Sequence, residues 1–228
     1  MEKIKNILFD LDGTIIEPQE GIINSILFAL NKMDIREENH QELKSFIGPP
    51  LIDSFATRYH LNTEKAKKAV NYYRQYFSKR GMYQTTLYPD ITKVLGRLKD
   101  ENYNLFIATS KPTIYAKKIL INFKIFDLFK EVTGSNLDNT RRDKTEIIGF
   151  ILKTYGLDPN GTLMIGDRKF DIIGAKNNAL MSIGAVYGHG SLEELQAEKV
   201  DFLANNCEEL YTIISNKKEQ NPVDGCES

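Results

Sequence analysis

Short apolar runs, each followed by turn residues, alternate along most of this chain with longer segments of helical spacing. The apolar runs span residues 7–9, 103–108, 131–133, 162–165, 181–186 and 201–203. The helical segments span residues 112–122, 144–155, 171–178 and 207–215. Because parallel strands are joined by helical crossovers, this alternation predicts an α/β fold built on a doubly wound parallel sheet. Ligands in such folds bind beyond the carboxyl ends of the strands.

Residues 17–88 interrupt this alternation, because they contain no convincing strand. Helical spacing occurs there at residues 22–33, 40–46, 51–59 and 63–79. We therefore predict an all-helical insertion over 17–88, within a core formed by 1–16 and 89–215. Pro49-Pro50 suits a helix start and Tyr88-Pro89-Asp90 suits re-entry into the core, since proline restricts its own backbone and that of the preceding residue. Residues 216–228 are polar and are predicted to form a disordered tail.

The charge balance argues against partners that need a strongly charged surface. Lys plus Arg number 30 against 31 Asp plus Glu, so the net charge of -1 provides no global field for nucleic acid or an anionic membrane. Two cysteines, Cys207 and Cys226, cannot form a disulfide framework or a zinc site. The apolar run near the N-terminus is too short for a signal peptide or a membrane span. These features predict a cytoplasmic protein with no nucleic-acid or membrane partner.

Asp10 and Asp12 follow the first apolar run, two residues apart, so a regular strand would place both on one face. Two crowded carboxylates are costly unless a cation neutralises them or one of them holds a proton, and Mg²⁺ with oxygen ligands is suited to this. The alternative interpretation is a turn, since Asp12-Gly13 is a common turn pair. These two residues alone do not separate the interpretations.

A second acidic cluster follows another apolar run, where Asp167 and Asp171 come after residues 162–165. If the two strands are neighbours, these acids face Asp10 across a small gap and complete a metal site of oxygen ligands. Asp171 could instead cap the helix that follows. One carboxylate can also do both.

Thr109 and Ser110 end a third apolar run, which we expect to lead directly into a helix. Their hydroxyls, with the free N–H groups of a helix N-terminus, could hold a phosphate, although capping alone is a common role for Ser and Thr. Lys144 opens a later helix. A lysine there is usually solvated, but beside the aspartates it would balance charge on a nucleophile and a phosphoryl group.

These residues resemble, in chain order, the four motifs of the haloacid dehalogenase superfamily. The motif residues are Asp10-Leu11-Asp12-Gly13-Thr14, Thr109, Lys144 and Gly166-Asp167-Arg168-Lys169-Phe170-Asp171. The chain is most similar to the phosphoglycolate phosphatase-like branch, through the position of the insertion, Ile47-Gly48-Pro49-Pro50-Leu51 and Ser110-Lys111-Pro112. The resemblance implies a Rossmann-like core with a helical cap. One departure is Asp90, which stands where Gly is usual after Tyr-Pro.

The resemblance also implies a role for each motif residue. Asp10 would be the nucleophile that forms an aspartyl-phosphate, and Asp12 would act as general acid and then as general base. Thr109 and Lys144 would bind the phosphoryl group. Mg²⁺ would be held by Asp10, the backbone carbonyl of Asp12 and Asp167, with Asp171 in support.

Among members of the superfamily that the chain resembles, an acid at the position of Asp12 implies C–O–P chemistry, because a leaving alkoxide needs a proton and dehalogenases lack this acid. We therefore expect a magnesium-dependent phosphatase acting on a small phosphorylated metabolite, as a monomer or homodimer. Nucleotide monophosphatase, inorganic pyrophosphatase, β-phosphoglucomutase-like enzyme and non-catalytic phosphate-binding protein are the alternatives. Gly48, Arg74 and Arg80 are candidates for substrate selection in the cap, although surface arginines are usually just solvated.

Overall fold

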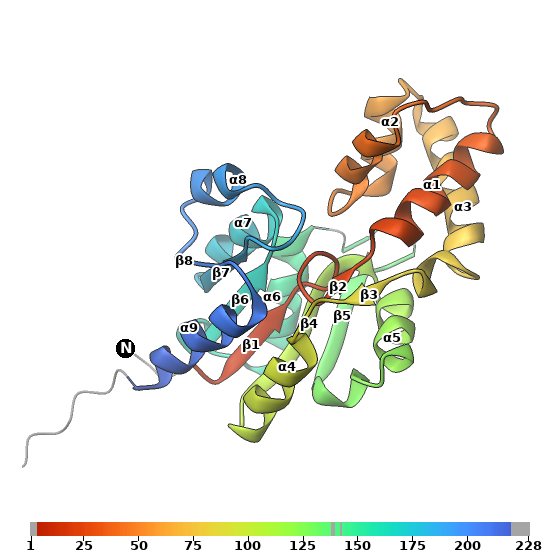
Figure 1. Ribbon diagram of the computed structural model, residues 1–228. Helices are drawn as coiled ribbons and strands as arrows, with labels where there is room; N and C mark the ends of the chain where they lie inside the picture. The colour runs from red at the N-terminus through yellow and green to blue at the C-terminus, as the bar shows by residue number, and fades with distance from the viewer. Residues whose placement is uncertain (1–3, 138–139, 142, 220–228) are drawn as a thin grey trace, which may run out of the picture.

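The computed structural model describes residues 4–137, 140–141 and 143–219, and its main sheet has six strands in the order β5-β4-β1-β6-β7-β8 (Figure 1). All neighbouring pairs in this sheet are parallel. The strands are β1 (Asn6–Phe9), β4 (Asn104–Pro112), β5 (Glu131–Ser135), β6 (Thr162–Gly166), β7 (Met181–Ala185) and β8 (Phe202–Ala204). The predicted α/β fold with a doubly wound parallel sheet is confirmed.

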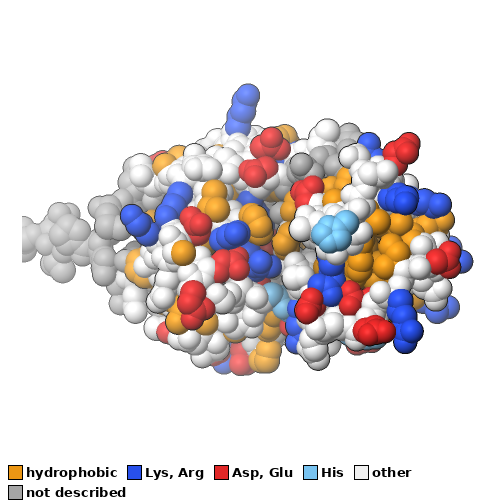
Figure 2. All heavy atoms as spheres, turned by 90° about the horizontal axis from the view of Figure 1, so that it is seen from above, with side chains coloured by type: hydrophobic (Ala, Val, Ile, Leu, Met, Phe, Trp, Pro, Cys, Tyr) orange, Lys and Arg blue, Asp and Glu red, His pale blue; other side chains and the backbone are white. Residues whose placement is uncertain are grey.

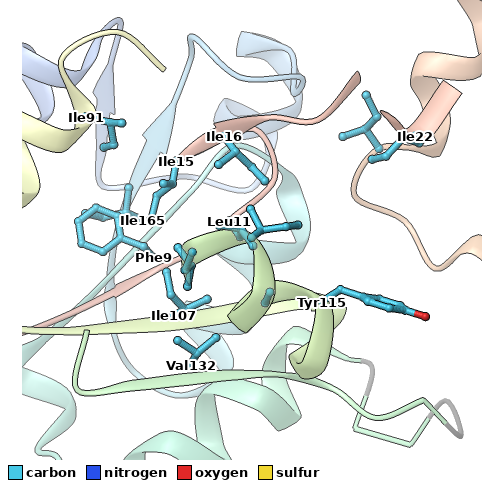
Figure 3. Packing of buried hydrophobic residues seen from close by; sticks show 14 of the residues in the cluster. Phe9, Leu11, Ile15, Ile16, Ile22, Ile91, Ile107, Tyr115, Val132 and Ile165 are labelled. Carbon is cyan, nitrogen blue, oxygen red and sulfur yellow. The ribbon is translucent and has the colours of Figure 1, made fainter. Parts of the chain in front are cut away.

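Helices cover both faces of this sheet. They are α4 (Ile91–Asp100), α5 (Thr113–Asn122), α6 (Lys144–Tyr155), α7 (Lys169–Asn177), α8 (Leu192–Ala197) and α9 (Cys207–Glu219), with short 3₁₀ turns η3 (Phe126–Leu128) and η4 (Pro159–Gly161). Successive side chains of a strand point to opposite faces. Accordingly, Ile7 and Phe9 of β1 pack in the larger apolar cluster, part of which is shown in Figure 3, whereas Leu8 packs under α6 in a smaller one.

A helical segment is inserted between β2 (Ile16–Glu17) and β3 (Thr86–Leu87), which pair with each other in an antiparallel ribbon. It contains α1 (Gln19–Asn31), η1 (His40–Phe46), α2 (Leu51–Arg58), α3 (Thr63–Phe77) and η2 (Gly81–Tyr83). In Figure 1 its helices stand apart from the sheet, at the upper right. We call this segment the insertion.

Several elements differ from the sequence-based predictions. Strands β2 and β3 were not predicted, because two residues are too few to show an alternating pattern. Helices α4 and α8 were also missed. Helix α9 continues to Glu219, so the predicted tail does not begin at 216, and residues 220–228 lie outside the described part of the chain.

Asp90 shows why glycine is usual at its position. Its φ is 61°, in the left-handed region that glycine adopts most easily, and it directly precedes α4. Aspartate tolerates this region better than most other residues, which keeps the consequence local to the turn.

Two general features complete the description. No helix within the described residues is both long and apolar enough to cross a bilayer. On the face seen in Figure 2, acidic and basic side chains are interspersed, as expected from the near-zero net charge.

Candidate active site

The site begins at the carboxyl end of β1, which lies between β4 and β6. Phe9 is level with Ile107 on one side and with Ile165 on the other. The next residue, Asp10, donates its backbone N–H to the carbonyl of Ile165 at 2.8 Å. The strand register therefore places Asp10 beside the residues that end β4 and β6.

Three buried carboxylates meet at this edge. Asp10, Asp167 and Asp171 each contribute an oxygen atom, and these atoms all lie within 4.8 Å of one another. The residues are 6%, 0% and 1% exposed, and Oδ1 of Asp167 accepts no hydrogen bond within the described residues. Hard divalent cations prefer such oxygen ligands, so this cluster could hold one.

The pKa values of this cluster follow from its burial. Burial raises the pKa of Asp167 well above its ordinary value, and the carboxylates of Asp171 and Asp10 raise it further. Burial also raises the pKa of Asp171 to about 6, against the opposing effect of the Lys144 ammonium. The raised pKa values indicate that the nearby positive charge does not balance these buried carboxylates.

Backbone crowding around Asp167 fixes its carboxylate. An added Cβ at Gly13 would lie 2.0 Å from Oδ2 of Asp167, so only glycine fits there. From the other side, the backbone N–H of His189 donates to the same Oδ2 at 2.8 Å. The imidazole of His189 lies 3.1 Å from the carboxylate of Glu17. None of the sequence motifs includes His189, and its contact with Glu17 joins segments far apart in the chain.

Asp171 serves the helix and the acidic cluster together. Its Oδ2 accepts the backbone N–H of Arg168 at 3.0 Å, at the start of α7. Its Oδ1 lies 2.7 Å from Nζ of Lys144. One carboxylate therefore caps the helix and also faces the other acids.

Lys144 is the cation of this cluster. It is 4% exposed, and its Nζ lies 2.9 Å from Oδ1 of Asp10 and donates to the carbonyl of Ala108 at 2.8 Å. Burial alone would lower the pKa of Lys144, but the carboxylates of Asp10 and Asp171 raise it above its ordinary value. The ammonium therefore stays charged.

The carboxylate of Asp12 is held away from this cluster by a residue that sequence reasoning did not select. Its Oδ1 lies 2.5 Å from Nζ of Lys111, in a salt bridge whose side chains are only 14% and 5% exposed. Burial raises the pKa of Asp12, although the Lys111 ammonium opposes the shift. Lys111 lies two residues after Thr109 in the same strand, but the register of β4 against β5 shifts between Thr109 and Pro112, so no regular alternation identifies it.

The helix predicted over residues 112–122 is present and starts one residue later than expected. Strand β4 continues to Pro112, and α5 begins only at Thr113 with no side-chain cap. The hydroxyl of Thr109 accepts the backbone N–H of Lys111 at 3.3 Å. Thr109 and Ser110 therefore reach the site from a strand, just before the helix begins.

A cavity of about 900 Å³, including its part open to solvent, lies between these residues and the insertion. Its floor contains Asp10, Asp12, Thr109, Ser110 and Lys111. Its walls are largely apolar and aromatic, with Ile22, Phe46, Pro49, Pro50, Leu51, Ile52, Val70, Tyr73, Phe77, Pro112 and Tyr115. Figure 3 shows Tyr115 pointing away from the labelled core residues of the sheet.

The three residues predicted to select substrate have different positions. Gly48 and Arg74 line the cavity, whereas Arg80 is exposed and does not. Arg74 also donates to the carbonyl of Leu137 at 2.9 Å, which ties the insertion to the core.

A further tie joins Arg168 of the core to the insertion. Its guanidinium donates a hydrogen bond to the carbonyl of Ile47. The Nε of the same guanidinium donates to Oε1 of Glu194 at 3.0 Å. Sequence reasoning missed this contact, because it joins residues that no motif connects.

Comparison with known proteins identifies the architecture around this site. The family model described as haloacid dehalogenase-like hydrolase matches residues 7–185. The chain belongs to this family. The match covers the three aspartates of the cluster, Asp12, Thr109 and Lys144, and it confirms the predicted superfamily and the hydrolase class.

Named relatives of this haloacid dehalogenase-like hydrolase include a 5'-nucleotidase and phosphoglycolate phosphatases. It is 42% identical over 194 residues to a 5'-nucleotidase of Pseudomonas aeruginosa, covering 85% of this chain and 88% of the relative. It is 25% identical over 221 residues to a phosphoglycolate phosphatase of Vibrio vulnificus, covering 93% and 97% of the two chains. The crystal structure of a predicted phosphatase from Clostridium acetobutylicum has a TM-score of 0.91 at 40% identity, covering 94% of this chain and all of that one.

Proposed function

We propose that this protein is a magnesium-dependent phosphatase that hydrolyses small phosphate monoesters through an aspartyl-phosphate on Asp10. The observation that carries the proposal is the meeting of three buried carboxylates and Lys144 around Asp10, which lines the cavity together with Asp12. Residence in the cytoplasm and a monomeric or homodimeric state remain predictions.

In the first step an oxygen of Asp10 attacks phosphorus, while the bond from phosphorus to the leaving oxygen breaks. Asp12 gives its proton to that oxygen. It then takes a proton from the water that attacks the phosphorus of the aspartyl-phosphate, which breaks the bond from phosphorus to Asp10 and releases phosphate. Lys144 is fixed 2.9 Å from Asp10, where its charge offsets the repulsion between a carboxylate and an anionic phosphate. Thr109 and Ser110 would donate hydroxyl hydrogen bonds to the phosphoryl oxygens.

The residues that would hold Mg²⁺ are Asp10 and Asp167 through their carboxylates and Asp12 through its backbone carbonyl, with Asp171 in support. The unsatisfied Oδ1 of Asp167 and the raised pKa values of Asp167 and Asp171 support this assignment. When bound, the ion supplies Lewis-acid stabilisation of negative charge on the phosphoryl group.

For the organic part of the substrate, the cavity favours a nucleoside monophosphate over phosphoglycolate. Phe46, Tyr73, Phe77 and Tyr115 line it, and aromatic walls suit stacking against a planar base. The 42% identity to a 5'-nucleotidase supports the same substrate class. Pyrophosphate and sugar phosphates remain alternatives on the same scaffold.

The test is phosphate release from nucleoside monophosphates, 2-phosphoglycolate, sugar phosphates, pyrophosphate and p-nitrophenyl phosphate, with Mg²⁺ or EDTA. We expect Mg²⁺-dependent release that Asp10→Asn abolishes, and nucleoside monophosphates to rank above 2-phosphoglycolate. Asp100→Asn, the same change at an exposed position, is the matched control and should leave release unchanged. Wild-type rates in Asp10→Asn would contradict the nucleophile, and binding of phosphate without any turnover would favour a non-catalytic protein.

A further inference from the structure

Two lysines pair with three of the four aspartates of the site. Lys144 lies against Asp10 and Asp171, whereas Lys111 lies against Asp12 alone among these four. The carboxylate of Asp12 is accordingly absent from the cluster of three acids that could hold a cation. Lys111 and Asp12 both line the cavity, so their salt bridge faces the space where the organic part of a substrate would lie.

The ammonium of Lys111 is enclosed by both parts of the molecule. Its Nζ lies 2.5 Å from Oδ1 of Asp12, which belongs to the core. The same Nζ lies 5.0 Å from the centre of the Phe77 ring, which belongs to α3 of the insertion. Its side chain is only 5% exposed. Burying a charge is costly even when it is paired, so a gain in folding stability does not by itself account for this ion pair.

A proton donor works only when its oxygen lies within hydrogen-bond reach of the leaving atom. Asp12 is on a turn two residues from Asp10. Without Lys111, the Asp12 carboxylate could rotate toward the carboxylate oxygens of the acidic cluster that could bind a cation. The salt bridge occupies Oδ1 of Asp12 and leaves Oδ2 available for the transferred proton.

We propose that Lys111 is a positioning residue, whose ammonium holds the Asp12 carboxyl group on the leaving-group side of the site. The inference rests on the proposed function, in which Asp12 protonates the leaving oxygen as the bond to phosphorus breaks. Lys111 itself exchanges no proton and forms no covalent bond in this step.

Leaving groups of different acidity test the inference, because p-nitrophenolate departs with little help from an acid whereas an alkoxide needs a proton. The substrates are p-nitrophenyl phosphate, phenyl phosphate and an alkyl phosphate, each with Mg²⁺. For Lys111→Met we expect kcat/KM to fall by about 10-fold or less with p-nitrophenyl phosphate and by about 100-fold or more with the alkyl phosphate. Lys111→Arg, which keeps the charge, should recover part of the difference.

The comparison is made between substrates on one preparation, so partial unfolding of a variant cancels. Lys117→Met is the matched control, since Lys117 forms an exposed salt bridge with Glu131 in which its side chain is 40% exposed. It should leave the dependence on the leaving group unchanged. Equal losses on all three substrates in Lys111→Met, or a rise in KM alone, would overturn the positioning role and indicate a direct contact with substrate.

Asp12→Asn separates this inference from the function on which it rests. In Asp12→Asn, the loss of kcat/KM should be larger for the alkyl phosphate than for p-nitrophenyl phosphate. If Asp12→Asn shows this dependence and Lys111→Met does not, the role of Lys111 alone is refuted. A uniform loss in Asp12→Asn would refute the acid itself. No release by the wild type from any of the three substrates would refute both.

Discussion

Nζ of Lys144 lies 2.9 Å from Oδ1 of Asp10, and both side chains are almost fully buried. Asp171 is the second acid in contact with this ammonium, and Asp167 lies within the same cluster. One fixed cation therefore faces three buried carboxyl groups. The imbalance has measurable consequences for stability and for metal binding.

Without Mg²⁺, protein stability should fall as the pH rises from about 4 to about 6 because of Asp171. Its pKa is about 6 in the folded protein and 3.8 ordinarily, so the folded state binds more protons over this range. The stabilisation from protonated Asp171 is complete below its ordinary pKa of 3.8, and it is lost as the pH rises past its pKa in the folded protein, about 6. Asp167 contributes with the same sign.

Added Mg²⁺ should reverse this loss, because it binds the ionised carboxylates. At 100 times its Kd we expect stabilisation of about 2.7 kcal/mol at about pH 7.5, and less at about pH 5. Thermal unfolding with Mg²⁺ or EDTA at the two pH values measures it. An identical Tm with and without Mg²⁺ at the higher pH would contradict a cation site here.

Lys144→Met should destabilise the protein by about 3–5 kcal/mol, because it leaves Asp10 and Asp171 buried without their counter-charge. Lys93→Met is the matched control, since Lys93 pairs with Glu208 where the side chains are 62% and 40% exposed. That change should cost about 1 kcal/mol or less. Urea unfolding compares the two, and equal losses would show that the buried cation is not needed for charge balance.

Arg74 and Arg80 should differ in their effect on catalysis. Arg74 lines the cavity and Arg80 does not, so Arg74→Gln should lower kcat/KM by about tenfold and Arg80→Gln should leave it unchanged. Steady-state kinetics with the best substrate of the panel measures both. If the Arg80 variant lost as much as the Arg74 variant, the shape of the cavity would be a poor guide to substrate contacts.

Gly48→Ala should impair activity beyond its effect on folding. Gly48 has a φ of 102°, and an added Cβ would lie 3.0 Å from a guanidinium nitrogen of Arg168, which holds the carbonyl of Ile47. Gly156→Ala is the control, because Gly156 has a φ of 60° with nothing within 4 Å of such a Cβ. Each change should cost about 1–2 kcal/mol of backbone strain.

Only the Gly48 variant should also lower kcat/KM, because it alone disturbs a contact between the core and the insertion. Unfolding and kinetic measurements on the same two preparations separate the effects. A fall of kcat/KM in both variants would attribute the loss to strain in general.

The positions of the acids could be predicted from the sequence for a geometric reason. Asp10 and Asp167 each follow a buried apolar run, and parallel strands end at one edge of a sheet. Once β1 and β6 pair, as Phe9 and Ile165 do, the acids that follow must be neighbours. Local pattern and sheet topology together are sufficient for this part of the site.

Contacts across the cavity could not be predicted in the same way. The salt bridge from Lys111 to Asp12 depends on the course of β4 through 109–112, where its register against β5 shifts. The contact of Arg168 with the carbonyl of Ile47 joins two parts of the molecule whose relative placement depends on tertiary packing. Neither contact has a periodic signal.

The ribbon of β2 and β3 carries both crossings of the chain between core and insertion. Ile16 pairs with Leu87 and Glu17 with Thr86, so the chain returns beside the point where it left. The insertion is therefore an exchangeable module: a helical segment from a relative could be grafted at these two positions without lengthening either connection. New substrate preferences could be acquired in this way while the acidic cluster stays intact.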